Sequence, residues 1–159
     1  MAGRKRDLDA TDWNILVELQ KNARTSFTEI GASVGLTGPA VRDRIRQMED
    51  DGIISGYTIA IDHALLGNPI RAMVTLQSKH EPGKRRLPDS YVLETLDHMP
   101  EVLRYWIVTG DVDFIIEVAL PSMKDMDELH RKLDRMGIFT TYIVLSYFGE
   151  SCIAPKPGN

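Results

Sequence analysis

The sequence predicts an α+β protein in which an N-terminal winged helix-turn-helix precedes a ferredoxin-like βαββαβ domain. Two observations carry this prediction. Between residues 25 and 56, two apolar stripes at helical spacing flank a short turn. From residue 70 onward, the apolar pattern follows the order strand-helix-strand-strand-helix-strand, which is the order of the split βαβ unit. We expect domains at 1–60 and 70–148, a linker at 61–69 and a tail at 149–159.

The first helix is marked by capping and acidic residues at its start, in the run Asp9-Ala10-Thr11-Asp12. Apolar side chains then recur at helical spacing. The expected buried face comprises Trp13, Leu16 and Leu19, with Ile15 and Val17 beside them.

The second helix has its own apolar stripe, in which Phe27, Ile30 and Val34 recur at helical spacing. Gly35 follows and is expected to end the helix, because glycine takes a left-handed backbone at little cost.

The third helix is expected to begin at Thr37, a good N-cap residue, with Pro39 in its first turn. Val41, Ile45 and Met48 give it a buried stripe. Two short amphipathic helices joined by a tight turn form a scaffold that presents the second of them to the major groove of DNA.

The outward face of this third helix carries the candidate DNA contacts. Arg42 and Arg46 are four residues apart and so lie one above the other. Arginine in such a place neutralises phosphate or makes a forked contact with guanine. The expected contact residues are Thr37, Gly38, Ala40, Arg42, Asp43, Arg44, Arg46 and Gln47. The alternative interpretation is a solvated helix face that happens to carry arginines.

Two of these residues have more than one interpretation. Asp43 either accepts a hydrogen bond from a cytosine amino group or pairs with Arg42, Arg46 or Gln47. Arg44 is two residues from Arg42 and therefore points elsewhere around the helix. It forms a structural ion pair, for which Glu29 is a candidate, or it reaches a flanking phosphate.

The segments on either side of the three helices add two expectations. Residues 52–59 begin with a glycine and continue as an apolar run, which predicts a helix stop and then a strand that forms the wing. Arg4-Lys5-Arg6 is a basic arm that reaches DNA or is merely a terminal tail.

Composition limits the class of protein. The formal net charge is −4, and residues 1–60 hold 8 Lys and Arg against 9 Asp and Glu. Any affinity for DNA must therefore come from the local placement of arginines, doubled by dimerisation. The single cysteine, Cys152, excludes an intramolecular disulfide and a Cys-rich metal site. No apolar run approaches the ~20 residues of a membrane helix, and no secretory signal is seen, so we expect a cytoplasmic protein without a membrane partner.

The second domain begins with a half-buried strand in which Ile70, Ala72, Val74 and Leu76 alternate with more polar residues. Asp89 or Ser90 is expected to cap a helix that runs to His98, and Pro100 follows its end. Strands are expected at 102–109 and 114–120. Ser122 is expected to cap a second helix, which Gly137 ends, and the last strand, 138–148, is apolar on both faces and thus expected to be covered on both sides. The expected inward residues of the two helices are Val92, Leu93, Leu96, Met123, Met126, Leu129, Leu133 and Met136.

A single sheet with both helices on one face leaves its other face open. That face is expected to expose Met73, Tyr105 and Ile107. Because exposed apolar patches of this kind mark interaction surfaces, we expect a second copy of the sheet to cover it in a homodimer.

The segment 109–113, which joins the strands expected at 102–109 and 114–120, has the chemistry of an amino-acid site. Gly110 allows backbone N–H groups to converge on a carboxylate, and Asp111 and Asp113 lie on one side of an extended backbone. One carboxylate accepts from an α-ammonium while the other fixes the turn. The alternative is an ordinary hairpin turn. The expected effector-binding residues are Thr109, Gly110, Asp111 and Asp113, with Thr140 and Thr141 of the last strand.

Taken in order, residues along nearly the whole chain resemble the Lrp/AsnC feast-famine transcription regulators. No single stretch is specific, but their order and spacing together are. The matching stretches are Leu8-Asp9, Asp12, Ile15-Leu16, Asn22-Ala23-Arg24, Leu36-Thr37, Val41, Arg44-Ile45, Glu49, Gly52-Ile53-Ile54, Gly56-Tyr57, Pro100-Glu101-Val102, Thr109-Gly110-Asp111 and Asp113.

The resemblance implies a DNA-binding domain joined to a RAM-type ligand-sensing domain that dimerises and builds octamers. It also implies an amino acid bound between dimers near Gly110–Asp113. The chain departs from the family pattern at Gly38-Pro39, where many relatives have a serine, and at Met48, where leucine is usual. Its basic loop Lys84-Arg85-Arg86 has no assigned role.

We therefore expect a sequence-specific transcriptional regulator that responds to an amino acid and needs no other cofactor. The alternative is a constitutive architectural DNA-binding protein with a vestigial effector site. An enzyme is not expected, because the chain has no serine elbow, phosphate loop or clustered metal ligands, and hence no catalytic or metal-binding residues.

Overall fold

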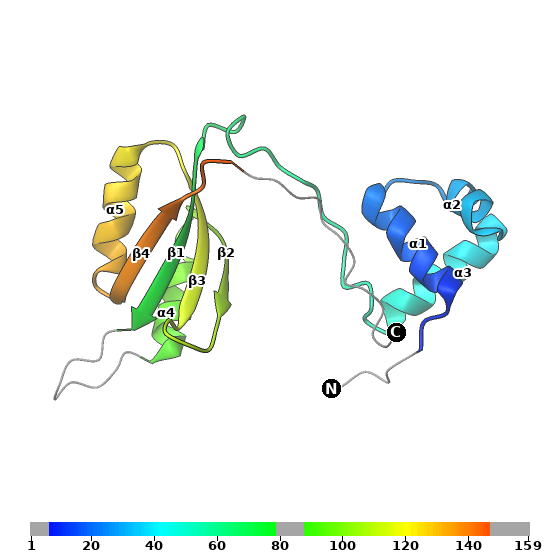
Figure 1. The fold of residues 1–159 in the computed structure, drawn as a ribbon, viewed down its shortest axis with the longest axis horizontal. Helices are drawn as coiled ribbons and strands as arrows, with labels where there is room; N and C mark the ends of the chain where they lie inside the picture. Colours follow the sequence, from blue (N-terminus) through cyan, green and yellow to red (C-terminus); the bar gives the residue numbers. More distant parts are fainter. Residues whose placement is uncertain (1–6, 79–87, 147–159) are drawn as a thin grey trace. The chain divides into compact units, whose positions relative to one another are not determined.

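A computed structural model describes residues 7–78 and 88–146, which form two compact units (Figure 1). The first unit runs to Ala60 and the second begins at Ile61. Arg4-Lys5-Arg6, the loop at 84–86, Phe148 and the tail at 149–159 lie outside the described residues.

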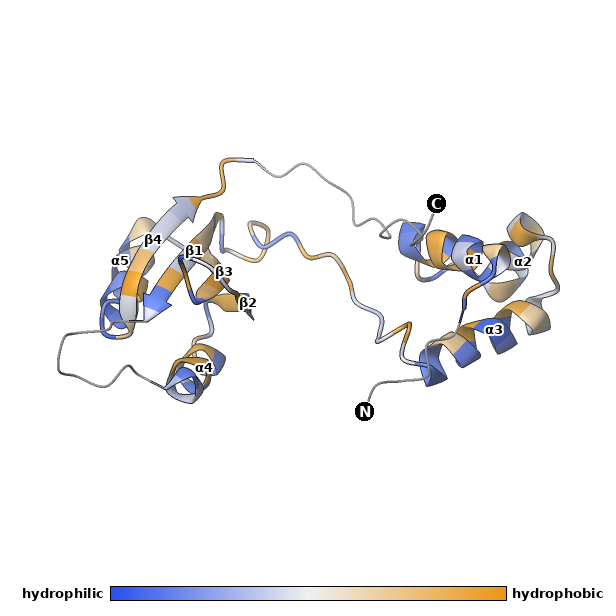
Figure 2. Ribbon diagram, turned by 60° about the horizontal axis from the view of Figure 1, so that its bottom comes forward, coloured by the Kyte–Doolittle hydropathy of each residue, from blue (hydrophilic) through white to orange (hydrophobic). Residues whose placement is uncertain are grey.

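The first unit comprises three helices, α1 (Ala10–Lys21), α2 (Phe27–Val34) and α3 (Gly38–Asp50). They enclose a small core of Ile15, Ile30, Val41, Ile45 and Met48. The apolar stripe predicted for α3 is confirmed, and Figure 2 shows bands of hydrophilic and hydrophobic residues along this helix.

The stripes predicted for α1 and α2 are only partly correct. Val17 and Phe27 are 40% and 42% exposed. Val17 lies about 200° around the helix from the fully buried Ile15, so both cannot face the core. Phe27 is the first residue of α2, one turn before the buried Ile30. Leu16, Leu19 and Val34 are half-buried and pack against the core, and Trp13 is also half-buried.

The turn between α2 and α3 depends on close backbone packing. Gly35 ends α2 with a φ of 73°, the left-handed conformation expected of it. A Cβ atom on Gly31 would lie 2.4 Å from the carbonyl oxygen of Leu36, so only glycine lets the chain turn back this tightly. Thr37 then caps α3, accepting from the backbone N–H of Ala40 at 3.4 Å, as predicted.

The prediction of a wing strand within residues 52–59 is wrong, because the structure has no strand there. After α3, the backbone N–H groups of Ile53 and Ile54 both donate to the Met48 carbonyl, and residues 55–60 then run without forming a strand. An extended segment becomes a strand only when another segment accepts its hydrogen bonds. The described residues place no such segment beside 55–60.

The second unit confirms the predicted βαββαβ order. Its elements are β1 (Ile70–Ser78), α4 (Asp89–Asp97), β2 (Val102–Ile107), β3 (Phe114–Leu120), α5 (Met123–Leu133) and β4 (Gly137–Ile143). The strands form one antiparallel sheet in the order β2-β3-β1-β4. Both helices bury apolar side chains in one cluster with Ala72, Val74, Leu76, Phe114 and Ile116 of the sheet, so both cover the same face.

Some element ends differ from those predicted. Pro88 takes the N-cap position of α4 with an extended backbone, so Asp89 and Ser90 lie inside the first turn. Ser122 caps α5 as predicted, but Gly137 begins β4 and does not end the helix. Met136 is buried just after α5, whereas Met123 is 53% exposed.

The open face of the sheet also differs from the prediction. A register shift between Val102 and Arg104 turns the next residues over, so Tyr105 faces the helices and donates to Asp97 of α4 at 2.6 Å. Trp106, which pairs with Ile115 of β3, takes the place on the open face that we had expected for Tyr105. Of the other two residues expected there, Met73 pairs with Glu117 and Tyr142 and does lie on the open face, where it is half-buried. The placement of Ile107 is wrong, because Ile107 pairs with the core residue Phe114 and so lies on the helix side at the end of β2, where it is 59% exposed.

The last strand is not covered on both sides within this chain. Ile138 and Tyr142 of β4 are 64% and 57% exposed. They alternate with Phe139, which packs against the core, and so belong to the open face together with Trp106, which is 43% exposed.

A three-residue ion cluster lies in the middle of this open face. Glu117 of β3 is 3% exposed, and its carboxylate accepts from Arg71 Nε at 2.6 Å and pairs with Arg104 Nε at 2.7 Å. The Arg104 guanidinium also lies 5.9 Å from the ring centre of Trp106. The open face therefore combines apolar side chains with a buried, fully engaged carboxylate.

Replacing Gly137 by alanine should destabilise the second unit. The added Cβ would lie 2.1 Å from the carbonyl oxygen of Gln77, which is backbone and cannot move without disturbing β1. We expect the free energy of unfolding to fall by about 1–3 kcal/mol in a thermal or denaturant melt. Thr140→Ala, at an exposed position of the same strand, is the control and should change it little. An unchanged melt for Gly137→Ala would show that the β1–β4 contact is looser than described.

Candidate functional site

The exposed side of α3 is the first candidate site. Burial of Val41, Ile45 and Met48 orients the helix, and Arg42, Arg46 and Gln47 are exposed on its other sides. Arg42 and Arg46 lie about 40° apart around the axis, which makes one continuous basic strip. Gly38 and Ala40 at the start of the helix are half-buried.

The start of α3 is held against α2. An added Cβ on Gly38 would lie 3.2 Å from the Thr28 hydroxyl. With Thr37 as cap and Pro39 in the first turn, the backbone N–H groups at this end are organised before any ligand arrives. The helix has no acidic residue in its first turn, so nothing there opposes an approaching phosphate.

Two polar residues of the predicted set have partners on α3. Asp43 pairs with Arg42 at 3.4 Å, which is one of the alternatives left open by the sequence. Both side chains are well exposed, so this pair is weak and Arg42 can exchange it for phosphate. Gln47 donates to Asp51 at 3.3 Å, at the C-terminal end of the helix.

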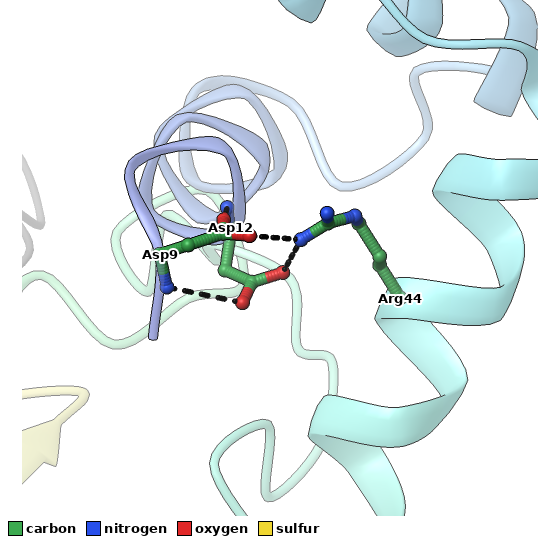
Figure 3. A network of polar contacts seen from close by, with 3 residues as sticks. All are labelled: Asp9, Asp12 and Arg44. Carbon is green, nitrogen blue, oxygen red and sulfur yellow. Dashed lines mark hydrogen bonds and ion pairs between the residues drawn. The ribbon is translucent and has the colours of Figure 1, made fainter. Parts of the chain in front are cut away.

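Arg44 does not share the exposed strip. Its Nη1 atom lies 2.7 Å from Asp9 Oδ2 and 2.7 Å from Asp12 Oδ1, both at the start of α1 (Figure 3). The partner suggested by the sequence, Glu29, is wrong. Glu29 instead forms a capping box with Ser26 at the start of α2, which lowers the pKa of its carboxyl group.

The two aspartates are organised by their own helix. Asp9 caps α1 by accepting from the backbone N–H of Asp12, and the Asp12 carboxylate accepts from the backbone N–H of Asp9. The Asp12 backbone N–H and the Arg44 guanidinium lower the pKa of Asp9, and the two carboxylates raise the pKa of Arg44. Each of these two shifts favours the charged form, so the contact between Asp9 and Arg44 is an ion pair at neutral pH.

A hydrogen bond between Tyr57 and Glu49 was not foreseen from the sequence. The Tyr57 hydroxyl donates to Glu49 Oε1 at 2.7 Å, which fastens the segment after α3 to the last turn of that helix. Partial burial, followed by the Glu49 hydrogen bond and charge, raises the pKa of Tyr57 to about 12. A tyrosine eight residues beyond a glutamate gives no periodic signal that would have revealed this contact.

The turn between β2 and β3 is the second candidate site. Gly110 has a φ of 133°, a conformation that L-residues rarely adopt. Asp113 anchors the turn to β1, because its backbone N–H donates to the Leu76 carbonyl at 3.0 Å and its Oδ2 accepts from Ser78 N at 2.8 Å. Asp111 is exposed, and among the described residues it has no hydrogen-bond or ion-pair partner.

The structure does not gather all the predicted effector residues. Thr140 pairs with Thr75 and lies on the open face, whereas Thr141 faces the helices, where its hydroxyl lies 2.9 Å from Nε2 of His130. Thr109 is exposed at the end of β2. Two hollows on the described surface lie elsewhere, one along α4 beside Tyr91 and His98 and one beside Pro121.

The described residues give no sign of a metal centre. No three His, Cys, Asp or Glu side chains among them are grouped closely enough to hold an ion. Nor is any of their helices both long and apolar enough to span a membrane.

Comparison with known protein families gives two matches that together span most of the chain. Residues 8–49 match the AsnC-type helix-turn-helix domain, and residues 73–151 match the Lrp/AsnC ligand binding domain. The HTH-type transcriptional regulator LrpC of Bacillus subtilis is 30% identical over 87% of this chain and 92% of its own length. The DNA-binding transcriptional activator DecR of Escherichia coli is 29% identical over 79% of this chain and 81% of its own.

Solved structures share the fold. That of B. subtilis LrpC has a TM-score of 0.80 at 25% identity and covers 91% of this chain and 99% of its own. A transcriptional regulator of Neisseria meningitidis, solved in complex with L-Met, has a TM-score of 0.81 at 22% identity. The match covers 94% of this chain and 97% of that one. At that identity the second similarity concerns the fold alone.

Glu49 should contribute, after burial, to the raised pKa of Tyr57. The pKa of Tyr57 is higher in the folded protein than in the unfolded chain, so this contact stabilises the fold fully below about pH 10 and stops doing so as pH rises through about 12. We expect Glu49→Gln to lower this pKa, because the neighbouring negative charge is removed. Tyrosinate absorbance, with Tyr57→Phe as the reference that isolates this residue, measures the change. Titration of Tyr57 near pH 10 in the unmodified protein would contradict the contact.

Proposed function

Because the chain belongs to the Lrp/AsnC family of transcriptional regulators, we propose that it reads specific duplex sites with α3 and changes its DNA binding or assembly when an amino acid binds. The protein is a transcriptional regulator with a DNA-binding and a ligand-binding domain, and its relatives are not enzymes. The proposal places it in the cytoplasm.

The observation that carries the DNA-binding part is the basic strip on α3. The helix is capped by Thr37, packed on its apolar side and anchored through Arg44, which leaves Arg42 and Arg46 exposed together. Arg42 and Arg46 are the proposed contacts with phosphate or guanine, with Gln47 beside them. Arg44 is engaged on the other side of the helix and is not proposed as a contact.

The acidic balance of the chain makes a single DNA-binding unit a weak ligand for DNA. We therefore propose a homodimer, in which two copies cover the open faces of their sheets. Trp106, Ile138 and Tyr142 give this face an apolar surface that solvent would otherwise meet. Assembly of such dimers to an octamer is part of the same proposal.

In the proposed effector site, the two aspartates of the turn have different roles. Asp113 is already bound to Ser78 and so holds the turn in place, while Asp111 is exposed and available to an α-ammonium group. The turn backbone at Gly110 would receive the α-carboxylate. Because these groups lie in an open turn, a second subunit would complete the site. The L-Met complex of the N. meningitidis regulator, which shares the fold, supports an amino acid as the ligand class.

Replacement of Arg42 by alanine should weaken DNA binding without altering assembly. We expect at least about a tenfold loss of affinity for duplexes selected by the unmodified protein from a randomised pool, since one charge-assisted contact is removed. Arg131→Ala removes an equally exposed arginine of α5 and is the control. Equal binding by both variants, with unchanged light scattering, would show that α3 does not present this strip to DNA.

Light scattering with each of the twenty amino acids tests the effector. One or a few should shift the assembly, because a ligand moves an equilibrium only when it prefers one state. Asp111→Asn should abolish the shift while leaving the melting temperature unchanged. Asp127→Asn, also at an exposed acidic position, should leave both the shift and the melting temperature unchanged. A distribution that no amino acid changes would argue against this effector class and favour a constitutive architectural DNA-binding protein.

A further inference from the structure

Arg44 lies on the wrong side of α3 to meet the DNA that Arg42 and Arg46 would touch. At about 100° per residue, it is some 160° around the axis from each of them. Its side chain is 31% exposed and ends between two carboxylates of α1. Figure 3 shows a single guanidinium nitrogen bridging Asp9 and Asp12.

The two carboxylates that hold Arg44 are fixed in position. Asp12 is 1% exposed, and the reciprocal capping bonds between Asp9 and Asp12 fix both residues in the first turn of α1. A guanidinium held at 2.7 Å by two such groups has a defined direction as well as a defined distance. The contact therefore joins the middle of α3 to the first turn of α1.

The remaining contacts of α3 decide which side of the helix faces the core, but they fix its exact rotation less closely. Ile45 and Met48 pack against Ile15 and Ile30, and apolar contacts are non-directional. Gly38 abuts Thr28 only at the start of the helix. The directional contact of Arg44 with Asp9 and Asp12 therefore limits rotation of α3 about its own axis.

We propose that Arg44 is a positioning residue for DNA reading. By fixing the roll of α3 against α1, it holds Arg42 and Arg46 at the angle that base-edge contacts demand, and it does not touch DNA itself. Such contacts tolerate displacements of only about 0.5 Å and 10–20°. This inference rests on the proposed DNA-binding function.

The experiment uses three variants: Arg44→Met, Asp12→Asn and the double variant that carries both changes. Arg42→Ala is the reference for loss of a direct DNA contact. For each variant of the full-length chain, affinity is measured for a duplex selected by the unmodified protein and for a random-sequence duplex, over a range of salt concentrations. Far-ultraviolet circular dichroism fixes a temperature at which every variant is folded. Arg44→Met keeps a long apolar stem, so packing changes little.

We expect Arg44→Met to weaken binding to the selected duplex about tenfold and binding to the random duplex by less than about twofold. For Arg44→Met, the slope of log affinity against log salt concentration should equal that of the unmodified protein, whereas Arg42→Ala should reduce the magnitude of this slope by about 0.9. Asp12→Asn should act in the same direction, and the double variant should be no weaker than the worse single variant, because both act through one contact.

Two results would overturn the inference. If Arg44→Met lowered the salt slope by about 0.9 and added to the effect of Asp12→Asn, Arg44 would be a phosphate contact. If both single variants discriminated between the two duplexes as well as the unmodified protein does, the contact between Arg44 and the two aspartates would have no part in reading DNA. If Arg44→Met does not fold, the result for Asp12→Asn alone decides the question. Failure of the unmodified chain to bind any duplex would instead refute the proposed function, which is a separate outcome.

Discussion

Burial of one apolar stripe in each element determines which surfaces this protein has left for function. In α3 the stripe of Val41, Ile45 and Met48 is removed from water, and the arginines on the opposite sides are exposed as a result. In the sheet, Ala72, Val74 and Leu76 face the helices, and the residues between them form the open face. The proposed DNA-binding surface and the proposed dimer surface are thus the residues that two small cores leave exposed.

Local features were predictable from the sequence because their causes lie within a few residues. The caps at Asp9, Thr37 and Ser122 and the helix end at Gly35 follow from backbone groups that must be satisfied nearby. The alternation along β1 and the βαββαβ order followed from periodicity in the same way.

Features that depend on distant parts of the chain were missed. Arg44 finds its carboxylates 32 and 35 residues away, and no spacing rule could choose Asp9 and Asp12 over Glu29. The register shift in β2, which reversed the expected direction of Tyr105, depends on pairing with β3 and not on the residues of β2 alone. The sequence correctly placed a turn with Gly110 and both aspartates between β2 and β3, but only the fold shows that Asp113 bonds to β1 and that Thr140 and Thr141 lie on opposite faces of the sheet.

The hydrogen bond between Tyr57 and Glu49 has a consequence for distance along DNA. With Tyr57 fastened to α3, the connector to β1 comprises residues 58–69, which would reach at most about 40 Å even if the hydrogen-bonded turn at 62–68 opened. Without that hydrogen bond, the connector would begin after Ile54, whose backbone N–H still donates to the Met48 carbonyl, and it would reach about 50 Å. Successive major-groove sites on one side of a duplex are about 34 Å apart. In the proposed assembly, the hydrogen bond between Tyr57 and Glu49 therefore shortens the reach of each DNA-binding unit and so limits the spacing of two half-sites that one dimer can read.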